Sequence, residues 1–224
     1  MGNTRSVSTL SLITIPALIT LGITILRLTG ELQHWSPLWF NPTPGGGGAL
    51  IGISWLPIIF GPYFAVKLAR AGDGPTSVGR SVGFAVLGFV VYALGGLLFG
   101  LTAQHPNILT LLASLLMLFA GFVPRLGWAS LNDALLSYAF AARIPVLVVM
   151  YLAMSGNGGA GWGTHYDGVP PMLTNATLSV KYFYAGVLPQ MTLWIGFTVV
   201  VGSLIGTIAA AVAQRGKRSA QAEA

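Results

Sequence analysis

The stretch YAGVLPQMTLWIGFTVVVGSLIGTIAAAV, residues 184–212, contains no charged side chain. A helix needs about 20 mostly apolar residues to cross the hydrocarbon core of a bilayer. This stretch is long enough to do so, and its composition suits lipid rather than water. The sequence therefore predicts a membrane-spanning helix over residues 184–212, and this decides the class of fold.

The composition of the whole chain agrees with that class. Of the 224 residues, 54% are hydrophobic and 7% are charged, whereas a soluble domain has about 25% charged residues. A water-facing surface cannot be built from this inventory, so the surrounding solvent must be lipid. The chain has no cysteine, which excludes disulfides and thiolate chemistry.

Further apolar stretches predict more helices, with connections too short for a separate soluble domain. The predicted helices cover about residues 10–28, 49–68, 82–102, 108–123, 134–154 and 184–212. Residues 213–224 form a short polar tail. We therefore expect one all-α domain over residues 1–224, a polytopic membrane bundle of six transmembrane helices.

The positions of the basic residues predict the orientation of this bundle. If six helices alternate, one side receives Arg5, Lys67, Arg70, Arg80, Arg125, Arg215, Lys217 and Arg218. The other side receives only Arg27 and Lys181. By the positive-inside rule, the first side is cytoplasmic and holds both termini. The net charge of +6 is spread singly over helix ends, which is not the footprint of a nucleic-acid-binding protein.

Histidines suggest one site in the outer connections. The chain has three histidines, His34, His105 and His165, and each falls in a different outer loop, with Glu31 and Asp167 on the same side. Three imidazoles and a carboxylate can bind zinc or copper. However, no two of these histidines have the spacing that would place them on one helix face. The metal site is therefore an alternative hypothesis beside ordinary interfacial histidines.

Arg143 is the strongest single polar candidate. It lies near the middle of the helix expected over residues 134–154, where an unpaired charge costs at least about 2.5 kcal/mol. It should therefore face the bundle interior, where it could contact a lipid ester, carboxylate or headgroup. The alternative is that this helix begins near Leu126 and that Arg143 pairs with a neighbouring helix or extends to the interface.

Catalysis has little support in the sequence. There is no G-x-S-x-G elbow, and the acidic residues all fall in loops or at helix ends. These residues are Glu31, Asp73, Asp133, Asp167 and Glu223. Intramembrane proteolysis and proton-coupled transport need carboxylates inside the spans, so we expect a protein that is not an enzyme and has no cofactor.

A binding cavity is what the remaining residues favour. The helix expected over residues 49–68 carries prolines and aromatic residues, and the last helix opens in the same way. Prolines free backbone carbonyls and kink helices, which can leave an interior pocket; ordinary kinked packing is the alternative. The candidate ligand-binding residues are Trp55, Pro57, Gly61, Tyr63, Arg143, Tyr184 and Pro189.

The stretch Trp55-Leu-Pro57-Ile-Ile-Phe-Gly61 resembles the W-x-P-x-x-x-G start of the second helix of the Insig proteins, six-helix sterol sensors of the endoplasmic reticulum. The turn at 72–75, the helix between Asn107 and Arg125, and the aromatic run before Pro189 are similar in order. The resemblance implies a six-helix bundle with a cavity for a sterol or another neutral lipid. Pro124 stands where the family has an aspartate, which puts the family's partner binding through that acid in doubt.

Three hypotheses follow. The first is a non-enzymatic, Insig-like membrane protein that binds a diacylglycerol-like or sterol-like membrane lipid and forms a homo-oligomer. The second is a metal-dependent membrane enzyme or cofactor carrier that uses the outer histidines. The third is an accessory subunit of a larger membrane complex. The multi-pass chain is expected in a bacterial inner membrane, with the endoplasmic reticulum as the alternative.

Overall fold

The computed structural model describes residues 8–46, 48–103 and 105–222, with side chains as far as residue 213. Every regular element in these ranges is a helix. The α-helices are α1 (Thr9–Leu32), α2 (Leu56–Arg70), α3 (Val78–Thr102), α4 (Ile108–Ala120), α5 (Ala129–Ser155), α6 (Leu178–Lys181) and α7 (Ile195–Ala222). Short 3-10 turns are η1 (Pro44–Gly46), η2 (Val123–Leu126), η3 (Asn157–Gly159) and η4 (Pro171–Leu173), and the π-helical stretches η5 (Tyr182–Val187) and η6 (Gln190–Trp194) join α6 to α7.

Within the described residues, five continuous helical segments are long and apolar enough to cross a bilayer. They are Thr9–Leu32, Val78–Thr102, Ile108–Leu126, Ala129–Ser155 and Leu178–Ala213. Large apolar side chains on their outer faces, such as Leu97 and Val148, are exposed. Such exposure is unfavourable in water and favourable in lipid. The chain is therefore an all-helical, multi-pass membrane protein.

The second expected helix is shorter than its sequence indicates. Residues 49–68 were expected to be helical, but α2 begins at Leu56 and has 15 residues. At about 1.5 Å per residue it is about 22 Å long, which is less than the roughly 30 Å of a bilayer core. Leu50 and Ile51 donate their backbone N–H groups to carbonyls of the preceding loop, so this part of the chain pairs with the loop instead of starting the helix.

Other boundaries are shifted by a few residues. The helix expected from residue 10 to 28 continues to Leu32, the helix expected from residue 134 begins at Ala129, and the last crossing begins at Leu178. The expected polar tail is helical as far as Ala222, and residues 223–224 lie outside the described residues. The longer α1 has a consequence for the site, because Arg27 and Glu31 then lie on one helix, four residues apart.

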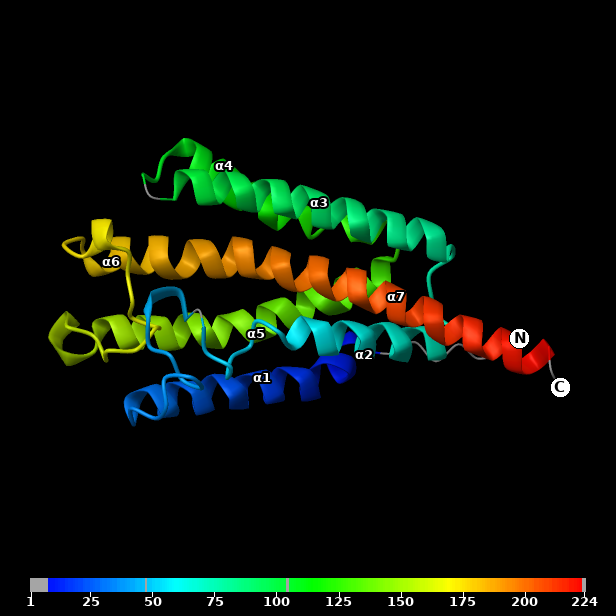
Figure 1. Ribbon diagram of the computed structural model, residues 1–224, viewed down its shortest axis with the longest axis horizontal. Coiled ribbons are helices and arrows are strands. Elements are labelled where there is room, and N and C mark those ends of the chain that lie inside the picture. Colours follow the sequence, from blue (N-terminus) through cyan, green and yellow to red (C-terminus); the bar gives the residue numbers. More distant parts are fainter. Residues whose placement is uncertain (1–7, 47, 104, 223–224) are drawn as a thin grey trace.

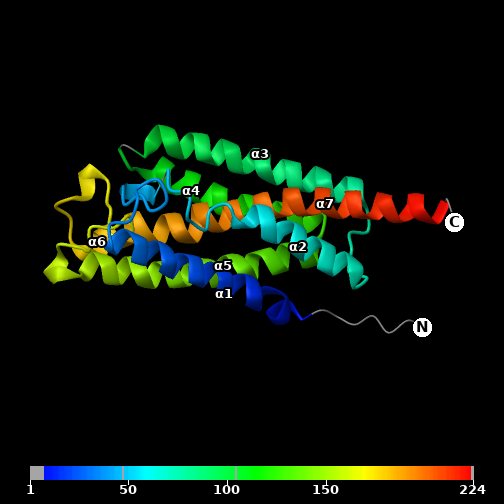
Figure 2. The same ribbon diagram turned by 60° about the horizontal axis from the view of Figure 1, so that its bottom comes forward.

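The helices run roughly along one axis and alternate in direction (Figures 1 and 2). The start of α1 and the end of α7 lie at one end, which we call the terminal end. The opposite end, where residues 33–55 and 156–177 lie, is the loop end. In Figure 1, α3 and α4 form an antiparallel pair along one side, α7 crosses the middle, and α5 and α1 complete the other side. Helix α2 occupies only the terminal half.

Glycines bring α2 and α7 into direct backbone contact. A Cβ atom at Gly61 would lie 2.3 Å from the carbonyl oxygen of Gly202, and one at Gly206 would lie 2.7 Å from the carbonyl oxygen of Gly61. Membrane helices lack a hydrophobic drive to associate in lipid, so close van der Waals packing between small residues holds them together. Gly61 therefore belongs to the helix crossing.

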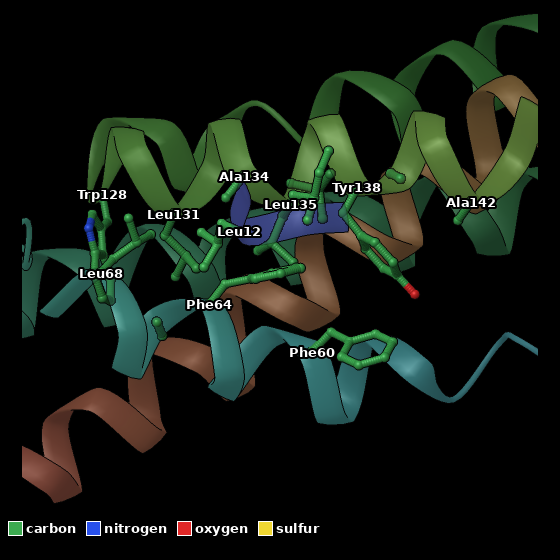
Figure 3. Packing of buried hydrophobic residues seen from close by; sticks show 14 of the residues in the cluster. Leu12, Phe60, Phe64, Leu68, Trp128, Leu131, Ala134, Leu135, Tyr138 and Ala142 are labelled. Carbon is green, nitrogen blue, oxygen red and sulfur yellow. The ribbon is translucent and has the colours of Figure 1, made fainter. Parts of the chain in front are cut away.

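Aromatic rings fill the core of the terminal half (Figure 3). Phe60 and Phe64 of α2 lie edge-on to Tyr138 of α5, with ring centroids 5.3 and 5.6 Å from the tyrosine ring. The hydroxyl of Tyr138 lies 2.8 Å from that of Thr20 on α1. Aromatic packing therefore fills the core around Tyr138, and the buried hydroxyl of this tyrosine is satisfied by a neighbouring helix.

Candidate functional site: a polar cavity in the loop half

Two irregular segments cover the loop half of the bundle. Residues 33–46 and 48–55 lie between α1 and α2, on the loop side of α2, and residues 156–177 connect α5 to α6 (Figures 1 and 2). Non-helical backbone at membrane depth is tolerated only where it is buried in protein or lines a cavity. Both segments are therefore expected to be held by specific contacts, and polar side chains provide them.

Glu31, near the end of α1, is the centre of these contacts. Its side chain is fully buried and accepts the Nε–H of Arg27 at 2.8 Å. It also accepts the backbone N–H of His165 at 2.8 Å, and its Oε1 lies 2.6 Å from the Nδ1 of His165. One carboxylate thus joins the end of α1 to the segment 156–177.

Arg27 holds the other covering segment. Its Nη2 donates to the carbonyl oxygens of Asn41 at 3.2 Å and Gly46 at 2.9 Å. Gly46 has a φ of 67°, and a Cβ atom there would lie 2.7 Å from Cδ2 of His165, so only glycine fits this turn. The loop, α1 and the segment 156–177 therefore converge on one ion-paired cluster.

Two further groups fasten the segment 156–177. The hydroxyl of Tyr166 donates to the carbonyl oxygen of Thr24 at 3.2 Å. The carboxylate of Asp167 accepts the backbone N–H groups of Gly163 at 3.0 Å and Thr164 at 2.8 Å. Asp167 therefore stabilises a turn, and Tyr166 attaches that turn to α1.

Beneath these segments lies a cavity of about 170 Å³. Its walls come from α1, α5, η6 and both covering segments, so no single stretch of sequence forms it. The polar side chains on its wall include Thr24, Arg27, Arg143, His165, Tyr166 and Gln190. The cavity is thus lined by residues of three segments that are long and apolar enough to cross a bilayer, and it is polar on several sides.

Arg143 enters this cavity from the middle of α5. Only 4% of its surface is exposed, and its guanidinium carbon lies 4.7 Å from the ring centroid of Trp194, a cation–π contact. Its Nη1 makes a long bond of 3.4 Å to Oε1 of Gln190. Its Nε has no hydrogen-bond partner among the described residues. Arg143 also forms no ion pair with a described carboxylate.

The last helix is distorted where it lines the cavity. Residues Gln190–Trp194 form a π-helical stretch, and such stretches occur frequently at functional sites. Pro189, directly before it, has no N–H to donate to the helix. The distortion places Gln190 and Trp194 on the cavity wall, where both contact Arg143.

Burial shifts the pKa values of two residues of the segment 156–177, His165 and Tyr166. Burial lowers the pKa of His165 below its ordinary value, and the bond to Glu31 offsets part of this effect. Burial also raises the pKa of Tyr166. Both shifts favour the uncharged forms of these two side chains.

The residues proposed from the sequence divide into groups. Arg143 and Pro189 lie on the cavity wall. Trp55 and Tyr184 are 41% and 49% exposed and face outward. The remaining candidates lie in α2 outside the cavity wall: Pro57 in its first turn, Gly61 at the crossing with α7, and Tyr63 against the core of the terminal half. They do not line the cavity because α2 occupies only the terminal half.

The structure does not bring the three histidines together. His34 and His105 are exposed, each in its own connection, whereas His165 is bonded to Glu31. No three histidine, aspartate or glutamate side chains among the described residues are grouped as metal ligands. The metal hypothesis therefore has no preformed ligand set in this part of the chain.

Sequence reasoning missed several residues of the site. Glu31 was assigned to a loop because the first helix was expected to end at residue 28, and Arg27 was expected at the end of that helix without a partner. A basic and an acidic residue four apart are nevertheless a signal for a helix-surface pair. Gln190 and Trp194 carry no such signal, because a glutamine and a tryptophan in an apolar span fit ordinary packing. Only the fold places them against Arg143.

Comparisons with known proteins do not assign the chain to a family. No family model matches it, and no curated protein and no solved structure is significantly similar to it. The fold alone defines the class, a multi-pass helical membrane protein with a polar cavity among its helices.

Proposed function

We propose that this chain is a non-enzymatic integral membrane protein that binds one membrane lipid, with the polar head of the lipid in the cavity. The observation that carries this proposal is Arg143, a guanidinium in the middle of α5 that lines a cavity without an anionic partner among the described residues. Ionisable residues inside a membrane are costly and mark ligand sites by default.

The size of the cavity supports a bound headgroup. An engineered apolar cavity of about 150 Å³ binds a benzene molecule, so 170 Å³ admits a group of similar size. The hydrocarbon part of the lipid would then lie outside the cavity. Trp55 and Tyr184 directly adjoin the cavity residues Ser54 and Ala185 in the chain and are exposed. We propose that these two aromatic side chains contact the lipid tail.

The chemical class of the lipid is a separate question. The resemblance to the Insig family implies a neutral lipid, either diacylglycerol-like or sterol-like, and this stays a prediction. In that case a hydroxyl or ester oxygen would accept a hydrogen bond from Arg143. A whole sterol ring system is larger than a benzene ring and would have to lie mostly outside the cavity.

Orientation and location are part of the proposal. We infer six crossings, with α2 and the segment 33–55 together making the second, and both termini in the cytoplasm. The exposed basic side chains at the terminal end, Lys67, Arg70, Arg80 and Arg125, support this orientation by the positive-inside rule. A bacterial inner membrane is the proposed location, with the endoplasmic reticulum as the alternative.

The test is native mass spectrometry of the detergent-purified full chain, followed by lipid extraction and elemental analysis of the same sample. We expect about one lipid per chain, and we expect Arg143→Gln to lose it. Arg80→Gln removes the same charge from an exposed position at the terminal end and should retain the lipid. The same spectrum reports whether the chain forms the homo-oligomer expected from its sequence.

Other results would favour the other hypotheses. Stoichiometric zinc or copper that is lost on replacing His165 would support the metal-dependent enzyme or cofactor carrier. Neither lipid nor metal in wild-type protein would overturn lipid binding and favour an accessory subunit of a larger complex.

A further inference from the structure

The charges around the cavity do not balance. Arg27 and Arg143 both line it, and among the described residues the only carboxylate bonded to either is that of Glu31. Glu31 accepts bonds from Arg27 and twice from His165. Its oxygens are therefore committed to holding the covering segments, and the positive charge of Arg143 is left uncompensated.

The unused hydrogen-bond donors of Arg143 also indicate a missing negatively charged partner. A guanidinium has five N–H donors and no acceptor. The face of this one lies on Trp194, one nitrogen makes a long bond to Gln190, and Nε has no described partner. The N–H groups of a planar guanidinium have the geometry to bind two oxygens of a carboxylate or phosphate at once. A neutral hydroxyl or ester would accept hydrogen bonds from some of these donors but would not compensate the positive charge of Arg143.

The beginning of α2 adds to the positive electrostatic potential of the cavity. Ile53 and Ser54, which lead into its first turn, line the cavity. The N-cap residue Trp55 makes no side-chain capping bond, and a helix N-terminus carries about half a positive charge. In membrane transporters, the N-termini of helices that begin inside the membrane point at anionic groups of the substrate. Helix α2 begins shortly after two residues of the wall of the cavity that Arg143 lines.

We propose that the cavity is an oxyanion site, in which Arg143 binds the carboxylate or phosphate head of a single-headed amphiphile. The proposal rests on the lipid-binding function above and replaces its neutral head with an anionic one. Because Glu31 pairs with Arg27, a negative head compensates the remaining positive charge of Arg143. Arg27 and the covering segments enclose the head, and Arg143 gives the site its preference for negative charge.

The experiment compares three amphiphiles with one oleoyl tail: oleate, oleoyl lysophosphatidic acid and monoolein. Full-length protein is delipidated in a neutral detergent, and its unfolding temperature is recorded as each amphiphile, or acetate or inorganic phosphate, is added. We expect half-maximal stabilisation by at least one anionic amphiphile at a concentration ten-fold or more below that of monoolein. Acetate and phosphate alone should act only at far higher concentrations, because they lack the tail.

Variants test the assignment to Arg143. Arg143→Gln should weaken the effect of the anionic amphiphile at least ten-fold and leave that of monoolein unchanged. Its unfolding temperature without amphiphile should be equal to or above that of wild type, since an uncompensated buried charge has been removed. Arg143→Lys keeps the charge without the planar fork and should retain part of the preference. Arg80→Gln, the matched change of charge, should behave as wild type.

The outcomes separate the two proposals. If monoolein stabilises as well as oleate and lysophosphatidate, and Arg143→Gln weakens all three alike, the oxyanion site is overturned and lipid binding stands. If Arg143→Gln changes none of them, both the oxyanion site and the lipid site at Arg143 are overturned. If acetate or phosphate alone acts as strongly as the amphiphiles and depends on Arg143, the oxyanion site stands and the lipid function falls. If no anion and no amphiphile acts on wild type, both are overturned.

Discussion

The terminal half and the loop half of this bundle bury their helices in different ways. In the terminal half, glycines of α2 and α7 bring backbones into contact, and aromatic rings fill the remaining space. In the loop half, α2 is replaced by irregular chain, and an ion-paired cluster holds two loops over a cavity. Van der Waals contact between helices holds one half together, whereas in the other half a buried ion-paired cluster positions the loops.

This difference shows that the loop half contributes less to the stability of the bundle than apolar packing would. A buried ion pair is weak support for stability, because desolvation can exceed the attraction between the charges. Apolar side chains could fill the loop half without this desolvation free energy. The loop half instead has Arg27, Glu31 and Arg143 beside a cavity. Binding of a ligand in that cavity would explain this arrangement.

The largest expected effect comes from breaking the charge cluster. Glu31→Gln keeps the shape of the side chain but leaves Arg27 buried without a counter-charge, and removing one partner of a buried pair costs about 3–5 kcal/mol. We expect a loss of this size in reversible unfolding by SDS. The control is Asp133→Asn, which breaks an ion pair with Arg125 whose side chains are 43% and 50% exposed. That variant should lose no more than about 1 kcal/mol, and equal losses would contradict the view that the loop half depends on buried charge.

The next effect comes from the glycine contact of the terminal half. Gly61→Ala places a Cβ against the backbone of Gly202, which no rotamer change can relieve, and overpacking of this kind costs about 1–3 kcal/mol. The unfolding temperature in a fixed detergent should therefore fall. Gly22→Ala is the control, since nothing lies within 4 Å of its added Cβ. It should be neutral or stabilising, because alanine favours a helix by about 1 kcal/mol over glycine.

A smaller effect is expected from acidification. The pKa of His165 is lowered by burial, with Arg27 acting in the same direction and Glu31 and Asp167 opposing. His165 therefore binds a proton more readily in the unfolded chain than in the folded one. Its contribution to the free energy of unfolding is complete above the ordinary pKa of about 6.5 and is lost as the pH falls through its lowered pKa in the folded chain. Unfolding temperatures between pH 7.5 and 5 should show this loss. His165→Gln should reduce the slope, whereas His34→Gln, at an exposed position, should keep it; a full slope in His165→Gln would show that another group titrates.

The smallest effect concerns the polar contact inside the terminal half. Tyr138→Phe removes the hydroxyl that bonds Thr20 but keeps the ring contacts with Phe60 and Phe64. Hydrogen bonds between membrane helices contribute about 0.6 kcal/mol on average, so the unfolding free energy should fall by about that amount. Tyr184→Phe, with 49% of the residue exposed, should change nothing. A loss above about 2 kcal/mol would mean that polar contacts matter in both halves.

Much of the fold could be predicted from the sequence, and the errors have physical causes. The spans over residues 82–102 and 108–123 are found within a few residues, because long apolar runs leave few alternatives in lipid. The expected helix over residues 49–68 was wrong in its first third, where backbone bonds to the preceding loop compete with the helix. Arg143 was recognised as buried and polar from its position alone, whereas its contacts with Gln190 and Trp194 depend on a distortion near Pro189 that no local pattern indicates.

The sequence by itself determined that this chain crosses a membrane as helices, since hydropathy and length are properties of single segments. It also determined that Arg143 lies deep in a span. Only the tertiary structure decided that α2 begins as late as Leu56, that Glu31 joins Arg27 to His165 across more than a hundred residues, and that a cavity forms beside Arg143. These features depend on contacts between distant segments, and pairings of that kind are set by the packing of the whole bundle rather than by any local pattern.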